Sequence, residues 1–465
     1  MMLMAIMVVE AGAAAAAGSP RWTRPVVIAR GTCRVATSSL AVAQNGRGNA
    51  LVAWVEICGS SDWRVVTSSR SPGRRFSPPR ILSITRAPLV TPHIEIALDG
   101  HGGATVVWTR ERFGVLSPGS TLLVATRSPG HRFGQPQVLD RDGVRPALAG
   151  NAGGEAIVVW QHVSPPGNIA RAGSVVAAVR APGTRRFGSP QTISAPLAQP
   201  QNRYATFPAE ALPAVSLAPN GGAIASWTRT DGTAPDCCTA IEAAVRTPSG
   251  PFGPPHRVSP AVSDISEWES TTVISDRGDA VVAWTTRRTF PDFSPNGMFA
   301  ARGGGQGFGP PIPLMRPEDV SRGTRFFDLG ILLASDGTPT VYWGEDPFDC
   351  SGARRRVAVT LRSGAALSQT LLAPTDGTIQ AFATALGADD RIVTVWIRRS
   401  GHSTDRYGAC YGGRYSAGAA IDGGPTLATP IARAEDFALA TGVSRPLLAW
   451  NVMNRILVSR LNGIS

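Results

Sequence analysis

Eight short segments share one pattern, in which a turn is followed by an apolar strand that ends in tryptophan. The first four read GNALVAW at Gly48–Trp54, GGATVVW at Gly102–Trp108, GGEAIVVW at Gly153–Trp160 and GGAIASW at Gly221–Trp227. The others are GDAVVAW at Gly278–Trp284, GTPTVYW at Gly337–Trp343, DRIVTVW at Asp390–Trp396 and SRPLLAW at Ser444–Trp450. Intervals of 52 to 67 residues separate the tryptophans, and these eight positions hold eight of the 11 Trp in the chain. Such self-similarity indicates a repeat architecture.

Each repeat reads as four short strands, which we name a to d in chain order. Strand b ends at the Trp, and a Val-rich strand c ends at an Arg. A Pro/Gly turn containing Phe then leads to strand d, as in Arg70-SPGRRF-Ser77 and Arg127-SPGHRF-Gly134. Alternating β-branched residues between Gly/Pro turns are typical of strands, and no stretch keeps a helical period. Four-stranded units repeated around an axis predict a β-propeller.

The two ends of the chain predict how the ring closes. After Trp450 a strand c at Arg455–Arg460 is the last strand, whereas Arg24–Ala29 resembles the d strands of other repeats. A last blade built from C-terminal strands a–c and an N-terminal strand d would remove the exposed edges of an open array. The sequence therefore predicts an all-β, eight-bladed propeller over residues 19–465 as a single domain, and we expect it to be a monomer.

Composition sets the wider limits. The 465 residues are 43% hydrophobic, which is enough for a core, and the 51 Gly and 38 Pro suit many turns. All 45 basic residues are arginine, against 33 acidic ones, for a net charge of +12. Because no aromatic–basic interleaving accompanies this charge, we expect no nucleic-acid partner.

Residues 1–18 form an apolar stretch that ends in small residues, which predicts a signal peptide and a secreted protein. Glu10 interrupts this stretch, so we expect no transmembrane anchor.

Six cysteines fit an exported chain with disulfides. In a propeller the a–b and c–d turns lie on one face, here the a–b face, and the b–c and d–a loops lie on the other, the b–c face. All six cysteines fall on the b–c face. Their blade positions predict the disulfides Cys33–Cys58 and Cys350–Cys410 and a vicinal pair Cys237–Cys238. No cysteine or histidine spacing typical of a metal site occurs, and no cofactor motif is present.

The chain resembles, in architecture, the secreted bacterial propellers of the sialidase-like (BNR) group. The Asp-box motif of that group is matched only in part, by Ser275–Gly278 before Trp284. The Arg-Ile-Pro motif of the group has its nearest match at Arg80–Leu82, where Leu replaces Pro. The resemblance implies a propeller fold and a role with carbohydrate, whereas the catalytic residues of that group have no counterparts here.

The candidate ligand-binding residues gather where strand b reaches the b–c face. Most lie two positions after a Trp, and tyrosines of one b–c loop could stack on sugar rings. These candidates are Glu56, Arg110, His162, Arg229, Glu345, Arg398, Tyr411 and Tyr415. The alternative interpretation of these side chains is that strand ends simply become polar where they meet water.

We expect a non-catalytic propeller that binds carbohydrate or a cell-surface partner. A sialidase-like glycoside hydrolase with carboxylates on the b–c face is the alternative, and a scaffold without a small ligand is a third. Arginines crowd the c–d turns and acidic residues the a–b turns of the opposite face. Mutual pairing explains both sets, and adhesion to an acidic polysaccharide is the alternative there.

Overall fold

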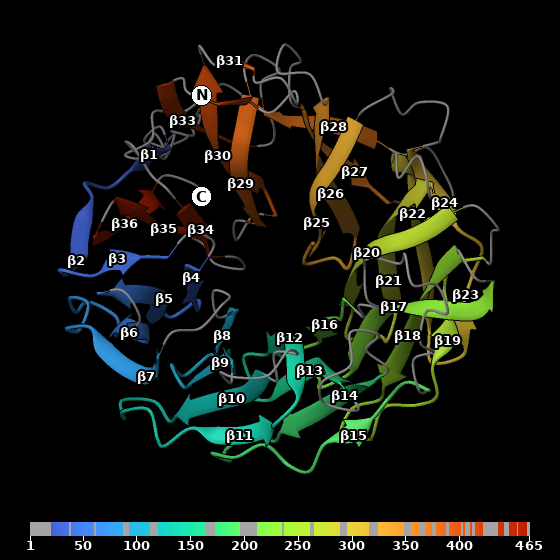
Figure 1. Ribbon diagram of the computed structural model, residues 1–465, viewed down its shortest axis with the longest axis horizontal. Helices are drawn as coiled ribbons and strands as arrows, with labels where there is room; N and C mark the ends of the chain where they lie inside the picture. Colours follow the sequence, from blue (N-terminus) through green and yellow to red (C-terminus); the bar gives the residue numbers. More distant parts are fainter. Residues whose placement is uncertain are drawn as a thin grey trace, which may run out of the picture.

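The computed structural model forms a closed ring of eight β-sheets around a central axis (Figure 1). It describes residues 20–36, 39–59, 62–86, 93–111, 120–163, 173–195, 212–234, 237–260, 265–288, 295–315, 324–347, 355–361, 368–373, 378–386, 390–400, 403–404, 410–411, 414–421, 436–440, 446–452 and 454–462. These residues contain no helix, and so none that is long and apolar enough to cross a membrane. The predicted eight-bladed propeller is confirmed.

The first four blades follow one another along the chain, and neighbouring strands pair in antiparallel fashion. Blade 1 contains β3 (Arg34–Val35), β4 (Ala41–Gln44), β5 (Ala50–Cys58), β6 (Asp62–Arg70) and β7 (Arg80–Arg86). Blade 2 contains β8 (Ile94–Leu98), β9 (Ala104–Glu111), β10 (Ser120–Arg127) and β11 (Gln137–Asp140). Blade 3 contains β12 (Gly143–Gly150), β13 (Ala156–Val163), β14 (Gly173–Arg180) and β15 (Gln191–Thr192). Blade 4 contains β16 (Ala214–Leu217), β17 (Ala223–Ala234), β18 (Cys237–Arg246) and β19 (His256–Arg257).

The other four blades complete the ring. Blade 5 contains β20 (Ile265–Ile274), β21 (Ala280–Arg288), β22 (Pro295–Gly304), β23 (Gly307–Phe308) and β24 (Ile312–Met315). Blade 6 contains β25 (Thr324–Leu333), β26 (Pro339–Pro347), β27 (Arg355–Thr360) and β28 (Ser368–Ala373). Blade 7 contains β29 (Thr378–Leu386), β30 (Ile392–Ser400) and β33 (Arg414–Ile421), and a separate hairpin pairs β31 (Ser403–Thr404) with β32 (Cys410–Tyr411). Blade 8 contains β34 (Asp436–Leu439), β35 (Leu447–Val452), β36 (Arg455–Asn462), β1 (Arg21–Trp22) and β2 (Val26–Arg30).

The ring closes as the two chain ends predict. Strand β2 pairs with β36 from Val26 opposite Val458 to Arg30 opposite Arg455, so the N-terminal segment is the outer strand of blade 8. The short β1 pairs with the far end of the same strand. In blade 5, β22 continues through Gly303 and Gly304, which pair with the short β23.

The repeated tryptophans form the packing between blades. All eight are at most 2% exposed. Trp108 packs with blade 1 residues such as Val65, and Trp160 packs with Leu122 of blade 2. Each ring fills the gap to the preceding blade, because one sheet cannot bury its own face alone.

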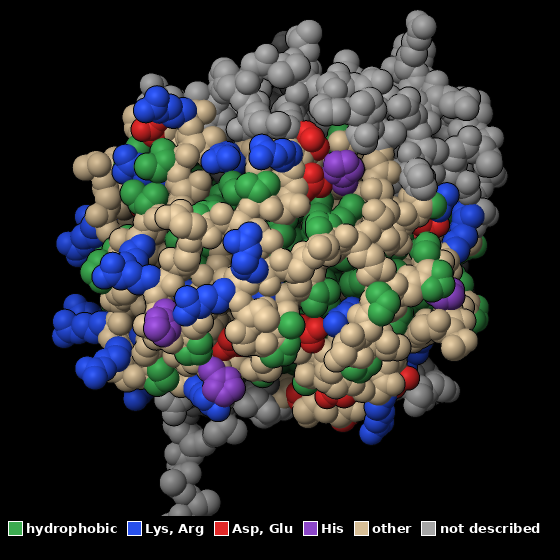
Figure 2. Space-filling model, turned by 90° about the horizontal axis from the view of Figure 1, so that it is seen from below, with side chains coloured by type: hydrophobic (Ala, Val, Ile, Leu, Met, Phe, Trp, Pro, Cys, Tyr) green, Lys and Arg blue, Asp and Glu red, His purple; other side chains and the backbone are tan. Residues whose placement is uncertain are grey.

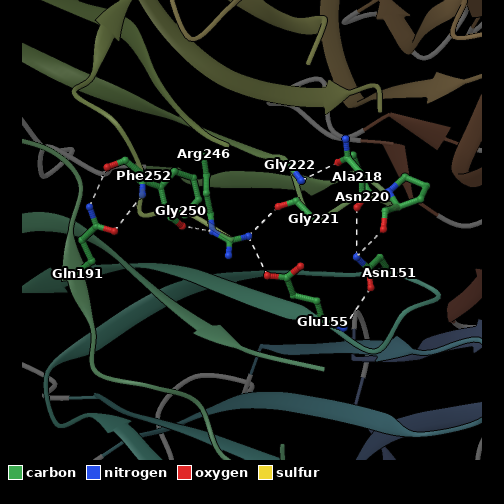
Figure 3. A network of polar contacts seen from close by, with 11 residues as sticks. Asn151, Glu155, Gln191, Ala218, Asn220, Gly221, Gly222, Arg246, Gly250 and Phe252 are labelled. Carbon is green, nitrogen blue, oxygen red and sulfur yellow. Dashed lines mark hydrogen bonds and ion pairs between the residues drawn. The ribbon is translucent and has the colours of Figure 1, made fainter. Parts of the chain in front are cut away.

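Hydrogen bonds on the a–b face join several of the a–b turns to the turn of the next blade. The Asn45 side chain donates to the Asp99 carbonyl at 2.7 Å, and Asn220 donates to the Asp276 carbonyl at 2.6 Å. Asn151 donates in the same way to Ala218, as Figure 3 shows. Neighbouring blades are therefore fixed to one another by polar contacts as well as by the tryptophan core.

Candidate functional site

The polar residues that follow the tryptophans lie on the b–c face, and two of them are carboxylates that bind their own blade's indole. Glu56 accepts a hydrogen bond from Trp54 Nε1 at 2.9 Å, and Glu345 accepts one from Trp343 Nε1 at the same distance. Since a buried indole N–H needs an acceptor, these glutamates have a structural role in addition to any contact with a ligand.

Two candidates, His162 and Arg229, are linked to the indole of their blade by a carboxylate on another strand. Asp140 of β11 accepts from Trp160 Nε1 at 2.7 Å and lies 2.8 Å from His162 Nδ1. In blade 4, Glu242 of β18 accepts from Trp227 Nε1 at 3.2 Å and from Arg229 at 2.8 Å. The carboxylate therefore bridges an indole N–H and a nitrogen of a second side chain, the His162 ring or the Arg229 guanidinium, in both blades. The sequence pattern did not reveal these two acids, because they lie on different strands from the tryptophans.

His162 is the candidate whose geometry is best suited to contact a ligand. Its side chain is 38% exposed, whereas its partner Asp140 is 12% exposed and is also held by the backbone N–H of Asp142. Asp140 fixes the ring through Nδ1, and Nε2 has no partner among the residues described. A ring fixed in this way presents one nitrogen in a defined direction, which suits a hydrogen bond to a sugar hydroxyl.

The remaining candidates divide into two groups. Arg110 lies in β9, half-buried, with no polar partner in the described part of the chain. Arg398 lies in β30, Tyr411 in β32 and Tyr415 in β33, but their side chains are outside the description. The backbone register nevertheless places Arg399 opposite Tyr415, so this part of blade 7 reaches the same face.

One of the predicted disulfides is present. Cys33 and Cys58 are joined, with a sequence separation of 25 and a Cα–Cα distance of 4.5 Å. The Glu56 carboxylate lies within 4.8 Å of both sulfurs, so this bridge fixes the chain next to the Trp54 pair. The other two predicted bridges, Cys350–Cys410 and Cys237–Cys238, involve side chains outside the described residues.

A polar cluster that the sequence did not reveal lies on the inner strands of blades 2 and 3. His93 Nε2 lies 2.9 Å from Glu95, and the two side chains are 54% and 38% exposed. Burial lowers the pKa of His93, but the hydrogen bond to Glu95 and the charge of Glu95 raise it above the usual value, with Arg145 opposing them. Arg145 has a φ of 51° within a bulge of β12, a conformation uncommon for this residue type. The strained backbone of Arg145 is the feature that marks this cluster, and it cannot be recognised from the sequence.

The arginines that end strand c on the a–b face are structural. Arg70 stacks over Phe76 at 4.9 Å and Arg127 over Phe133 at 5.2 Å. Burial, with a smaller effect of Arg460, lowers the pKa of Arg70 to about 10. Burial also lowers the pKa values of Arg127 and Arg180, against the opposing charge of Asp99.

Pairing across the rim, which the sequence favours, is most complete in the network of Figure 3. Arg246 of β18 lies 2.8 Å from Glu155 of the blade 3 turn, with side chains 5% and 10% exposed. Exposed arginines remain further out in the c–d turns. Figure 2 shows arginine side chains over the outer side of the blades at the bottom of Figure 1. The exposed ones in these turns are Arg74, Arg75, Arg132, Arg185 and Arg186.

A cavity of about 690 Å³ opens on the a–b face between blades 5, 6 and 7. Its charged lining residues are already engaged by the chain. Asp390 accepts from the Ser335 backbone and hydroxyl, and Arg302 donates to the Leu361 carbonyl. Because these groups are satisfied, this cavity offers a ligand fewer free polar partners than the b–c face does.

Comparison with known proteins confirms the architecture. No family model and no curated protein matches the chain. An ulvan lyase described as a new family of polysaccharide lyase and bound to -[GlcA(1-4)Rha3S]- is 11% identical. It matches over 94% of this chain and 95% of its own, with a TM-score of 0.52. The polysaccharide lyase Uly1 matches at 8% identity over 92% and 90%, with a TM-score of 0.50. The NanB sialidase of Streptococcus pneumoniae matches at 9% identity over 69% and 67%, with a TM-score of 0.36. The two polysaccharide lyase structures thus share the β-propeller fold of this chain.

Proposed function

We propose that this protein binds carbohydrate on its b–c face, outside the cell, without cleaving it. The observation that carries the proposal is the Asp140–His162 pair, in which a buried carboxylate holds a half-exposed imidazole at the exit of strand b. Arg229 is held by Glu242 in the equivalent place one blade further on. Ordered donors of this kind lose little side-chain entropy when they bind a polar ligand, which favours recognition of hydroxyl-rich molecules.

The hydrolase alternative has less support. A retaining glycosidase needs two carboxyl groups about 5 Å apart. The two leading candidates, Glu56 and Glu345, belong to blades 1 and 6, and each accepts a hydrogen bond from the indole of its own blade. Both carboxylates are therefore used in packing, on blades separated by two others in the ring.

Two further findings support the proposal. Two solved structures that match with a TM-score of 0.50 or more are named as polysaccharide lyases, and one of them is bound to -[GlcA(1-4)Rha3S]-. The Cys33–Cys58 disulfide favours an oxidising compartment, in agreement with the signal peptide expected from the sequence.

A glycan array with matched histidine variants tests this function. His162→Ala should weaken binding while Asp140 continues to hold Trp160, and His131→Ala is the control because His131 is exposed in a c–d turn on the opposite face. We expect glycan binding that His162→Ala reduces and His131→Ala leaves unchanged. Binding to no glycan, or an equal effect of both variants, would refute the proposal. Product release from a fluorogenic glycoside panel would establish the hydrolase instead.

A further inference from the structure

The tryptophan of blade 2 differs from its counterparts in blades 1, 3, 4 and 6. Trp108 is fully buried, and its Nε1–H has no hydrogen-bond partner in the structure. In those other blades the same indole N–H donates to a carboxylate. An unsatisfied buried donor costs about 1–3 kcal/mol, so its persistence calls for an explanation.

The strand registers show what is missing at this place. In blade 2, Asp140 lies opposite Leu122, and a bulge follows at the next pair. In blade 1, Ser83 lies opposite Val65, and a bulge again follows at the next pair. Ser83 therefore holds the position in blade 1 that Asp140 holds in blade 2. Where blade 3 receives a carboxylate from its neighbour, blade 2 receives only a short hydroxyl.

The cation of the pair is nevertheless present. Arg110 follows Trp108 by two positions, as His162 follows Trp160 and Arg229 follows Trp227. In both other blades, one carboxylate bridges the indole N–H and the side chain two positions later, an imidazole in blade 3 and a guanidinium in blade 4. Blade 2 has both donors without an acid to bridge them among the described residues.

We infer that Trp108, Arg110 and Ser83 form a binding site for the carboxylate of a ligand, with its oxygens in the place that Asp140 takes one blade further on. The three groups offer an indole N–H, a guanidinium and a hydroxyl. Together they suit a carboxylate that accepts a hydrogen bond from the indole with one oxygen and whose charge is balanced by Arg110. Building on the proposed function, the ligand class is a carboxylated sugar such as a uronate.

Blade 5 provides an internal comparison. Trp284 Nε1 also lacks a partner, but Thr286 stands where Arg110 would be and donates its hydroxyl to Gly297. On the preceding blade, the hydroxyl of Ser259 accepts a hydrogen bond from the backbone N–H of Ile241, so it is already used by the chain. Without a cation at this place, blade 5 should not select an anion, so the site is specific to blade 2.

The experiment follows the indole N–H resonances by ¹⁵N NMR. The Trp108 resonance is assigned from Trp108→Phe, and the protein is titrated with a glucuronate oligosaccharide and with its carboxyl-reduced, neutral form. We expect the acidic sugar alone to shift the Trp108 resonance while that of Trp284 stays in place. Free sodium glucuronate serves as a further probe of the carboxylate by itself.

Two variants test the site without depending on each other. Ser83→Asp should place an internal carboxylate on Trp108, weaken binding of the acidic sugar at least about tenfold and raise the melting temperature. Arg110→Gln should weaken the same binding about tenfold, which is the order expected for one charge-assisted hydrogen bond. If Ser83→Asp fails to fold, the binding measured with Arg110→Gln still tests the carboxylate site.

The outcomes separate this site from the proposed function. Equal binding of the acidic and neutral sugars, or unchanged binding in the folded variants, would overturn the carboxylate site while carbohydrate binding stands. If neither sugar binds but glucuronate still shifts Trp108, carbohydrate binding on this face fails and the carboxylate site stands. A Trp108 resonance that no carboxylate moves would mean that the indole is satisfied by water alone.

Discussion

The buried ion pair between Glu155 and Arg246 predicts strong energetic coupling between blades 3 and 4. Arg246 lies 2.8 Å from Glu155 and also donates to the carbonyls of Gly221 and Gly250, both at 2.7 Å (Figure 3). Removing one partner of such a pair leaves an uncompensated charge and costs about 3–5 kcal/mol. Because the two carbonyls remain as acceptors for Arg246, we expect Glu155→Ala to lower the free energy of unfolding by about 3 kcal/mol, near the lower end of this range.

The double-mutant cycle separates the pair from its surroundings. Arg246→Met leaves the Glu155 carboxylate buried without its partner and leaves two carbonyls without their donor, so we expect a loss of about 4 kcal/mol. The double variant removes both charges, and its loss should fall short of the sum of the single losses by about 2 kcal/mol.

Equilibrium urea unfolding measures these differences from shifts of the midpoint at a constant slope. Arg186→Met is the matched control, because Arg186 is exposed in a c–d turn and should change the stability by less than about 0.5 kcal/mol. If the two single losses add to within about 0.5 kcal/mol, the pair is not coupled and the reasoning is wrong.

Three further perturbations follow from the packing, the disulfide and the inner polar cluster. Trp284→Ala should cost about 3–5 kcal/mol, since the ring is 1% exposed, and a melting curve like that of the wild type would contradict this. Reducing the Cys33–Cys58 bridge should cost up to about 3.5 kcal/mol from loop entropy, and the Cys33→Ser/Cys58→Ser variant should be insensitive to the reductant. The folded-state pKa of His93 is raised, so its stabilising effect is present below the unfolded value of about 6.5 and is lost as pH rises through the folded value. Glu95→Gln should therefore reduce stability more at pH 5.5 than at pH 8.5 in thermal melts, with Arg145 weakening the effect, and an equal loss at both pH values would contradict it.

The fold could be predicted from sequence because the repeat carries the information in local patterns. Each Trp marks one apolar strand, and Gly-containing turns set where strands a and b meet. The prediction that strand b ends at the Trp was wrong, because the strand continues past it toward the b–c face, as β5 does to Cys58. The strand at Arg24–Ala29 resembles the other d strands, and β2 at Val26–Arg30 indeed completes blade 8. The Cys33–Cys58 bridge followed from the same blade assignment. These predictions need only the order of strands within a blade and of blades in the ring.

The contacts of Asp140 and Glu242 could not be predicted, because they join side chains on different strands, and the register between those strands is not visible in the sequence. Asp140 meets Trp160 only because β11 shifts register between Leu122 and Leu123. The arginines at the ends of strand c looked like a basic rim in the sequence. In the structure Arg70 lies over Phe76, where burial of a long side chain against an aromatic ring offsets the loss of hydration.

A repeat of this kind makes departures from the pattern more informative than the pattern itself. Four blades satisfy the buried indole N–H with a carboxylate of the chain, which comes from the same strand, from strand c of the same blade or from strand d of the preceding blade. Blade 5 leaves Trp284 without an acceptor, but it has no cation at the position of Arg110. Blade 2 keeps Trp108 and Arg110 but faces Ser83 in the place of the acid. Its indole N–H therefore lacks an acceptor from the chain, and a ligand could supply one. Packing alone does not account for a cation beside an unsatisfied donor, because an apolar residue at that place would cost less. The place where the chain fails to complete its own pattern is thus the place where a ligand is most expected to complete it.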